Sequence, residues 1–178
     1  MPRNVELKAR AADLAAVEAR AKLLADQGPF ELSQDDTFFT CSTGRLKLRQ
    51  FRADHGELIF YRRPDTEGPK LSEYVLAPTS APGELREALS QAYGVSGRVL
   101  KQRRLYLVGQ TRVHLDQVEG LGDFVELEVV LTDEQTLAEG EQIAGGLLRE
   151  LGIATSCLID RAYVDLLREM ADAKGSSM

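Results

Sequence analysis

Residues 119–128 read Glu-Gly-Leu-Gly-Asp-Phe-Val-Glu-Leu-Glu, a turn followed by a strand. The glycines of the turn suit a chain reversal, because glycine adopts backbone angles that other residues avoid. From Asp123 to Leu131 apolar and polar residues alternate, which predicts a β-strand. Side chains two residues apart lie on the same face of a strand, so the carboxylates of Glu126 and Glu128 point to the same side.

Seven other segments have a strand-like composition and are bounded by Gly, Asp or Pro at plausible turns. They run from Asn4 to Lys8, Gln34 to Cys41, Arg45 to Phe51, Glu57 to Arg63, Lys70 to Leu76, Arg98 to Val108 and Gln110 to Val118. Together with the first segment they make eight strands. Their connections are mostly short, which favours antiparallel pairing.

Apolar residues at helical spacing predict four helices. They run from Asp13, as N-cap, to the Gly28-Pro29 pair, from Pro82 to Gly94, from Asp133 to Leu151 and from Ser156 to Ala171. No internal repeat or linker divides the chain. We therefore expect an α+β protein in which residues 1–178 form a single domain.

The composition excludes several classes of protein. A hydrophobic content of 43% is enough to bury a core, and the net charge of -6 argues against a coat for nucleic-acid polymers. Two distant cysteines, Cys41 and Cys157, do not make a disulfide framework and are expected as reduced thiols. No stretch is long and apolar enough to cross a bilayer, so we expect a cytoplasmic monomer or homodimer without membrane contact.

Like charges repeat on single strand faces. Arg45, Lys47 and Arg49 share one face, as do Lys101 and Arg103. Alternation alone favours an ordinary solvated sheet face. However, an ordinary surface intersperses charges of opposite sign, and a bound polyanion would relieve the repulsion between these cations.

If the strands close into a barrel, the charged faces point inward. Cations on one wall could then grip phosphate oxygens, while carboxylates opposite hold a divalent cation. Mg²⁺ commonly binds one or two carboxylates together with substrate phosphates, so Glu6, Glu126 and Glu128 are sufficient ligands.

The ordered segments resemble the CYTH, or triphosphate tunnel, superfamily of class IV adenylyl cyclases, thiamine triphosphatases and inorganic triphosphatases. Residues 119–128 resemble its Gly-Leu-Gly-x-Phe-x-Glu-x-Glu motif. Val5-Glu6-Leu7-Lys8 resembles its Glu-x-Glu-x-Lys motif, with Asn4 in place of the first Glu. Further similarity lies in residues 44–49, 58–63, 101–106 and 114–116, so the resemblance spans nearly the whole chain.

The resemblance implies an eight-stranded antiparallel β-barrel, dependence on Mg²⁺ or Mn²⁺, and a small triphosphate substrate such as tripolyphosphate, thiamine triphosphate or ATP. It makes Glu6, Glu126 and Glu128 candidate metal ligands, and Lys8 and Asp116 candidate catalytic residues. The candidate substrate-binding residues are Lys8, Lys47, Arg49, Arg63, Lys101, Arg103 and Arg112. Lys47 is included because it shares the face of Arg49, and strand parity leaves the choice between Arg62 and Arg63 open.

Three side chains keep alternatives open. Asn4 could be a weaker ligand, a ligand to water or a surface residue. His114 shares a face with Asp116 and is expected to be structural rather than catalytic. Tyr163 could plug a tunnel mouth, but is expected to pack on the barrel with its hydroxyl in water.

Three functions compete. The first is a metal-dependent triphosphatase, which releases orthophosphate. The second is a class IV adenylyl cyclase, which converts ATP to cyclic AMP and pyrophosphate and is favoured by the likeness of residues 101–109 to bacterial cyclases. The third is a non-catalytic module that binds polyphosphate or nucleotide. Hydrolysis is placed narrowly first, because both reactions need the same triphosphate grip and no base pocket is visible in the sequence.

Overall fold

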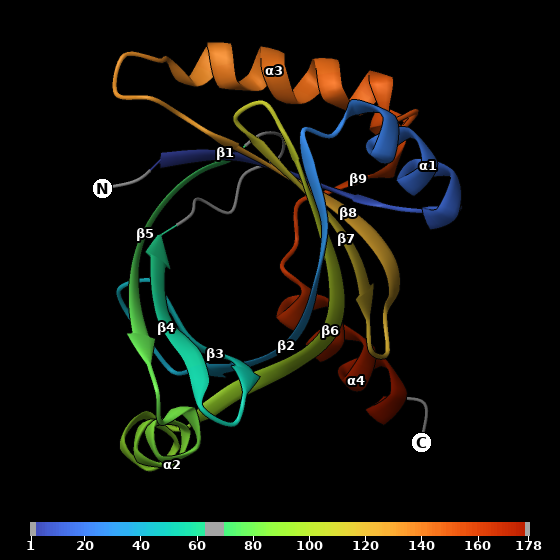
Figure 1. The fold of residues 1–178 in the computed structure, drawn as a ribbon. Helices are drawn as coiled ribbons and strands as arrows, with labels where there is room; N and C mark the ends of the chain where they lie inside the picture. Colours follow the sequence, from blue (N-terminus) through green and yellow to red (C-terminus); the bar gives the residue numbers. More distant parts are fainter. Residues whose placement is uncertain (1–2, 63–69, 177–178) are drawn as a thin grey trace.

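The computed structural model describes residues 3–62 and 70–176, and its main feature is an antiparallel sheet closed into a ring (Figure 1). The strands follow the order β5-β4-β3-β2-β6-β7-β8-β1, and β1 pairs with both β8 and β5. A ninth strand, β9, is short and adds to β1. The strands are β1 (Arg3–Arg10), β2 (Gln27–Phe39), β3 (Arg45–Arg52), β4 (His55–Arg62), β5 (Lys70–Thr79), β6 (Val95–Val108), β7 (Thr111–Val118), β8 (Gly122–Val130) and β9 (Leu158–Ile159).

Helices flank this ring, so the predicted α+β class and the eight-stranded antiparallel ring are confirmed. They are α1 (Leu14–Leu24), α2 (Pro82–Tyr93), α3 (Leu137–Glu150) and α4 (Tyr163–Gly175), with a 3-10 turn at Thr155–Cys157. Among the described residues, no helix is both long and apolar enough to cross a membrane.

The core lies outside the ring, between the sheet and the helices. Outward side chains of β1, β7 and β8 pack with α1 and α3 in one cluster, which includes Val5, Val113, Leu127, Val17 and Leu147. Because the side chains of a strand alternate, burying these apolar faces against helices turns the charged faces into the ring. The charged faces are therefore inside, and the interpretation as an ordinary solvated sheet face is wrong.

Three helix predictions need correction. The helix expected from Asp133 begins at Leu137, because Thr136 is its N-cap and its hydroxyl accepts a hydrogen bond from the Glu139 N–H. Asp13 is the N-cap of α1, as expected, and its carboxylate accepts a hydrogen bond from the Ala16 N–H at 2.9 Å. However, α1 ends at Leu24, because the following chain enters β2 and pairs with β6 from Gln27 onward. The Gly28-Pro29 pair therefore belongs to a strand and does not end the helix.

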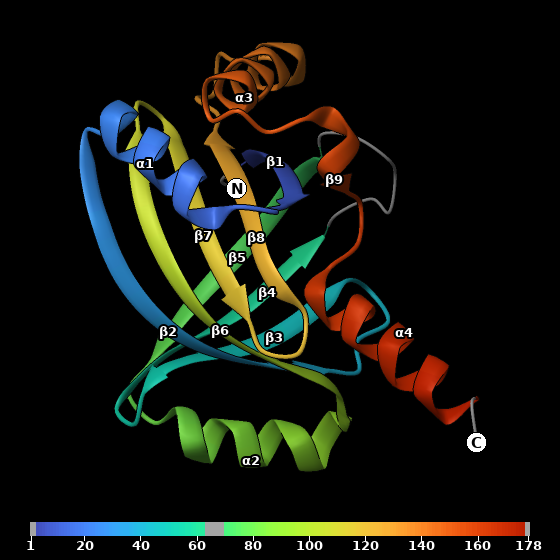
Figure 2. The same cartoon turned by 90° about the vertical axis from the view of Figure 1, so that its right-hand side faces the viewer.

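The last helix begins at Tyr163 and not at Ser156. The residues before it are not α-helical, because Thr155–Cys157 form the 3-10 turn and Leu158 and Ile159 form β9, which pairs with Ala9 and Lys8 of β1. Figure 2 shows α4 at one end of the ring and the connection between β3 and β4 at the other. At the α4 end, the Arg45 guanidinium donates to Asp165 of the helix at 2.7 Å.

Candidate functional site

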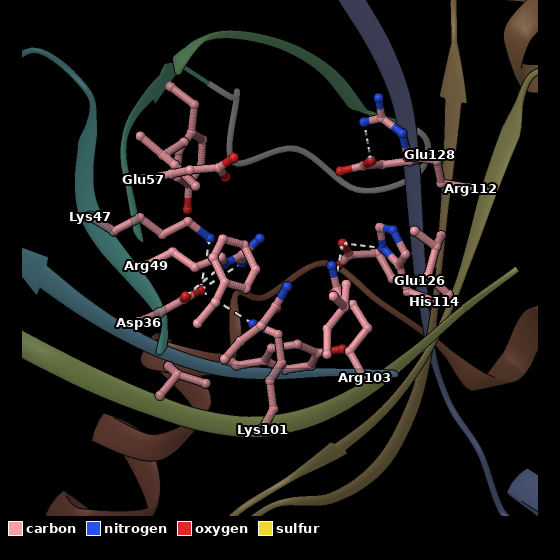
Figure 3. A pocket seen from close by; sticks show the side chains of 18 of the residues that line it. Asp36, Lys47, Arg49, Glu57, Lys101, Arg103, Arg112, His114, Glu126 and Glu128 are labelled. Carbon is pink, nitrogen blue, oxygen red and sulfur yellow. Dashed lines mark hydrogen bonds and ion pairs between the residues drawn. The ribbon is translucent and has the colours of Figure 1, made fainter. Parts of the chain in front are cut away.

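The ring encloses a cavity of about 720 Å³, lined by the inward side chains of all eight long strands and by the start of α4. Charges of both signs line it in nearly equal numbers. The basic residues are Lys8, Lys47, Arg49, Arg52, Lys101, Arg103 and Arg112, and the acidic residues are Glu6, Glu31, Asp36, Glu57, Glu126 and Glu128. The expected division into a cationic wall and an acidic wall is thus incomplete, because Asp36 and Glu57 lie among the cations (Figure 3).

The Asp36 cluster comprises Asp36, Lys47, Arg49 and Lys101. Arg49 donates two hydrogen bonds to the Asp36 carboxylate, each 2.7 Å long. The ammonium groups of Lys47 and Lys101 lie 3.0 and 3.2 Å from Asp36 Oδ2. The carboxylate, only 1% exposed, therefore holds three cations side by side on the cavity wall.

Burial and mutual repulsion set the ionisation of this cluster. Burial by itself would raise the pKa of Asp36, but Arg49, Lys101 and Lys47 lower it well below its usual value. Burial lowers the pKa of Lys101 to about 7, although Asp36 acts in the opposite direction. Lys101 is therefore close to losing its proton near neutral pH.

Sequence reasoning did not find Asp36, because the sequence offers two adjacent aspartates. Asp36 faces the cavity, while Asp35 faces α2 and binds Arg86 at 3.0 Å and Arg98 at 2.7 Å. The alternation of the strand does separate the two aspartates onto opposite faces. What points Asp36 inward is its pairing opposite Arg49 in the β2–β3 ladder.

The Glu126 cluster lies on the opposite side of the cavity and comprises Arg112, His114, Glu126 and Glu128 (Figure 3), together with Lys8, which forms an ion pair with Glu126. Glu126 lies 3.4 Å from the Lys8 ammonium and 3.4 Å from His114 Nδ1, and Glu128 lies 3.2 Å from Arg112. Burial would raise the pKa of Glu126, but Lys8, His114 and Arg103 lower it well below its usual value. The two contacts of Glu126 are longer than any contact in the Asp36 cluster, and the Arg112–Glu128 contact equals the longest of them.

The Glu126 cluster has the donors that a divalent cation needs. Ligand atoms of His114, Glu126 and Glu128 all lie within 4.8 Å of one another. Oxygen and nitrogen ligands of one Mg²⁺ would lie about 3 to 4.2 Å apart, so these side chains would have to move closer together to hold an ion. Glu6 also lines the cavity and pairs directly opposite Glu128 in the β1–β8 ladder. The residues present therefore fit a hard cation bound mainly through oxygen.

Asn4 supports the same fit. Its side chain is 2% exposed and lines the cavity, so the alternative that it is a surface residue is wrong. Within the described chain its Oδ1 atom has no hydrogen-bond partner. A buried amide oxygen without a partner is costly, and a cation or its water would satisfy it.

Asp116 lies behind the cavity wall, with an exposure of 0%. It accepts two hydrogen bonds from Arg103, at 2.6 and 2.7 Å, and one from the Tyr163 hydroxyl at 2.8 Å. The expectation of a Tyr163 hydroxyl in water is therefore wrong. Burial, Asp116 and Glu126 all raise the pKa of Tyr163 well above its usual value. The Tyr163 ring fills the α4 end of the cavity, with the Lys8 ammonium 4.0 Å from its centre.

Most of the substrate-binding candidates meet in this one cavity. Lys8, Lys47, Arg49, Lys101, Arg103 and Arg112 all line it. Arg63 lies outside the described residues. Arg62 is exposed and donates to the Thr43 carbonyl at 3.1 Å, so it points away from the cavity. Glu57, which sequence reasoning did not select, also points into the cavity (Figure 3).

Comparison with known proteins connects this geometry to a family. The model of the CYTH domain family matches residues 2–163. Adenylate cyclase CyaB of Aeromonas hydrophila is 35% identical over 71 residues, which are 40% of this chain and 37% of that protein's length.

Solved structures share the fold. A protein from Pyrococcus horikoshii superimposes with a TM-score of 0.82 at 22% identity, over 92% of this chain and 98% of its own. A Hippeastrum protein, classed as an adenylyl cyclase and described as having a dominant triphosphatase activity, gives 0.63 at 18% identity, over 86% and 89%.

Proposed function

The chain belongs to the CYTH domain family, and from that premise we propose that it is a metal-dependent enzyme that hydrolyses a triphosphate-bearing substrate. The observation that carries the proposal is the meeting of two complementary groups in one cavity. Seven Lys and Arg side chains line it, together with a histidine and two glutamates whose ligand atoms lie within 4.8 Å of one another. The first group suits phosphate oxygens and the second suits a divalent cation.

The near balance of charge in the cavity supports a role for the cation. Asp36 and Glu126 already neutralise much of the basic charge around them. A triphosphate would therefore meet carboxylates as well as cations, and a second source of positive charge would favour its binding. A bound Mg²⁺ or Mn²⁺ supplies that charge and polarises the phosphorus–oxygen bonds.

In this proposal the protein's own residues grip and orient the phosphates. Arg49 and Arg103 offer planar forks that are already oriented by Asp36 and Asp116, so less side-chain entropy is lost on binding. Lys47 and Lys101 add point charges to the same wall. Asp116 acts as a positioning residue, since it holds Arg103 and Tyr163 and does not line the cavity.

The reaction is a transfer of the terminal phosphoryl group to water. A new bond forms between the water oxygen and the terminal phosphorus, while the bond from that phosphorus to the bridging oxygen breaks. The attacking water loses a proton, which is released to solvent, and the products are orthophosphate and the diphosphate. Lys8 lies 3.4 Å from Glu126 and can donate a hydrogen bond to the departing oxygen as negative charge develops on it.

Adenylyl cyclase activity is the second candidate, and the 35% identity to CyaB over 71 residues favours it. In that reaction the ribose 3′-hydroxyl attacks the α-phosphorus, and pyrophosphate leaves. The grip on the phosphates would be the same, but the attacking group would come from the substrate.

Product analysis distinguishes these activities. The protein is incubated with tripolyphosphate, thiamine triphosphate or ATP in the presence of Mg²⁺ or Mn²⁺, and its products are separated. We expect orthophosphate. Cyclic AMP with pyrophosphate would establish the cyclase instead, and binding of triphosphate without turnover under all conditions would leave only a binding module.

A further inference from the structure

Tyr163 contacts the cationic side chains of the cavity in two different ways. Its hydroxyl donates to Asp116 Oδ2 at 2.8 Å, the same oxygen that accepts from Arg103 Nη2 at 2.7 Å. The centre of its ring lies 4.0 Å from the Lys8 ammonium and 5.8 Å from that of Lys101. One side chain of α4 therefore reaches cations of both β1 and β6, directly or through one carboxylate.

The hydroxyl contact restrains the direction of Arg103. Asp116 is 0% exposed, and its carboxylate holds the Arg103 guanidinium at 2.6 and 2.7 Å. Hydrogen bonds weaken as their angles depart from linear, so a carboxylate that also accepts from Tyr163 has one preferred orientation. Without the hydroxyl the ion pair would remain but could turn more freely. The Arg103 fork would then present its donors to phosphate oxygens in a less fixed direction.

The ring contact restrains the Lys8 ammonium. A cation is attracted to the face of an aromatic ring, and the attraction is strongest where both groups are removed from water. Lys8 and Tyr163 are only 9% and 6% exposed. The Lys8 ammonium also donates to the Arg161 carbonyl, two residues before Tyr163, at 3.4 Å. The segment that leads into α4 therefore holds Lys8 together with Glu126, which lies 3.4 Å from the same ammonium.

Tyr163 reaches these partners because α4, at one end of the ring (Figure 2), packs very closely on β6. A side-chain carbon at Gly97 of β6 would overlap Cγ2 of Val164, the residue after Tyr163. Valine is stiff about its first side-chain bond, so this overlap would push the start of α4 away from the strand. The missing side chain at Gly97 therefore helps to set the position of Tyr163.

We propose that Tyr163 is a positioning residue of the triphosphate site, which orients Arg103 through its hydroxyl and Lys8 through its ring. The inference rests on the proposed function and deepens it, since it makes the start of α4 part of the site. In that function Arg103 binds phosphate, whereas Lys8 donates to the departing oxygen. The hydroxyl therefore contributes to affinity and the ring contributes to turnover, a division that a purely structural tyrosine would not show.

The first test separates the hydroxyl from the ring. Tyr163→Phe removes only the hydroxyl, so we expect the dissociation constant for tripolyphosphate to rise about fivefold and kcat to change less than about twofold. Tyr163→Leu also removes the ring and should lower kcat about tenfold in addition. Calorimetry in EDTA, where a metal-dependent reaction stops, gives the dissociation constants, and steady-state kinetics in Mn²⁺ gives kcat. Tyr93→Leu, at a 56% exposed position on α2, is the control and should change neither.

A double-mutant cycle tests whether the ring acts through Lys8. In a Lys8→Met background the ammonium is absent, so Tyr163→Leu should lower kcat no more than Tyr163→Phe does. A tyrosine that only stabilises the fold would lower kcat by the same factor with and without Lys8. Urea unfolding verifies that each variant is folded under the assay conditions.

A further variant moves Tyr163 without altering it. Gly97→Ala displaces the start of α4 and should raise the dissociation constant about fivefold. Gly83→Ala on α2 is the matched control, because no atom of residues 3–62 and 70–176 lies within 4 Å of the added carbon.

Two results would overturn the proposal: an unchanged dissociation constant in folded Tyr163→Phe, or an equal loss of kcat in Tyr163→Leu with and without Lys8. If no triphosphate is turned over, the proposed function fails. The dissociation constants of Tyr163→Phe and Gly97→Ala then still decide whether Tyr163 orients Arg103.

Discussion

The buried carboxylates on the two sides of the cavity differ in how closely they contact their cations. In the Asp36 cluster one carboxylate receives short contacts from three cations, at 2.7 to 3.2 Å. In the Glu126 cluster the carboxylates have longer contacts, at 3.2 to 3.5 Å. Short, mutually saturating contacts hold cations in a fixed arrangement, whereas long contacts leave carboxylate oxygens able to accept a metal. The same residue types therefore hold cationic side chains in fixed positions on one side of the cavity and leave carboxylate oxygens able to bind a metal ion on the other.

Glu128→Gln has the largest expected effect, because it removes a carboxylate of the Glu126 cluster. Since metal charge on a phosphoryl group contributes several kcal/mol, we expect kcat/KM for tripolyphosphate to fall about 10³-fold, or about 4 kcal/mol. The stability should change by less than about 1 kcal/mol, because Glu128 and its partner Arg112 are both partly exposed. Steady-state kinetics and urea unfolding give the two values. Glu84→Gln on α2 is the control, and full turnover in Glu128→Gln would remove the metal site from this cluster.

Asp36→Asn should instead have its main effect on stability, by lowering the free energy of unfolding. It leaves three cations without their common partner, and breaking a buried ion pair costs about 3–5 kcal/mol of unfolding free energy. Tripolyphosphate should then stabilise the variant more than the wild type, because its oxygens replace the lost carboxylate. Asp35→Asn next to it is the matched control, and its outward pairs should cost about 1 kcal/mol or less. Equal stability losses in the two variants would show that Asp36 has no special role.

Substitutions at Asn4 test whether its side-chain oxygen contributes to metal binding on the Glu126 side of the cavity. Asn4→Asp adds a charge to an oxygen that lies in the cavity without a hydrogen-bond partner among residues 3–62 and 70–176, so we expect Mn²⁺ to bind about tenfold more tightly. Asn4→Ala removes the oxygen and should weaken binding. Electron paramagnetic resonance of free Mn²⁺ measures both without any substrate. If aspartate and alanine give the same affinity, Asn4 is not directed at the metal.

The smallest expected effect concerns pH. The pKa of Lys101 is about 7, so its ammonium loses its proton as the pH rises through neutrality, and its attraction for phosphate is lost above that value. We expect the affinity for tripolyphosphate to fall about threefold or more between pH 6.5 and 8.5. Arg stays charged over this range, so Lys101→Arg should remove most of the fall. Calorimetric titrations at several pH values test this, and parallel profiles in both proteins would exclude Lys101.

The amino-acid sequence alone is enough to predict which side chains share a strand face. Alternation grouped Lys47 with Arg49 and Glu126 with Glu128, and the order of the motifs was sufficient to expect a closed antiparallel ring. These features are local, because each depends only on the period of a single strand. The inward candidates on those strands, from Lys8 to Arg112, do meet in one cavity.

How these strand faces lie relative to one another depends on the tertiary structure. The pairing of β1 with β8 places Glu6 opposite Glu128, and the pairing of β2 with β3 points Asp36 rather than Asp35 inward. The docking of α4 buries Tyr163 against Asp116. Each of these contacts depends on register or packing between distant segments, and the period of one strand carries no information about the register of another. The alternation of residues along each strand therefore predicts which side chains share a face, whereas the closure of the ring brings these faces together to form the site.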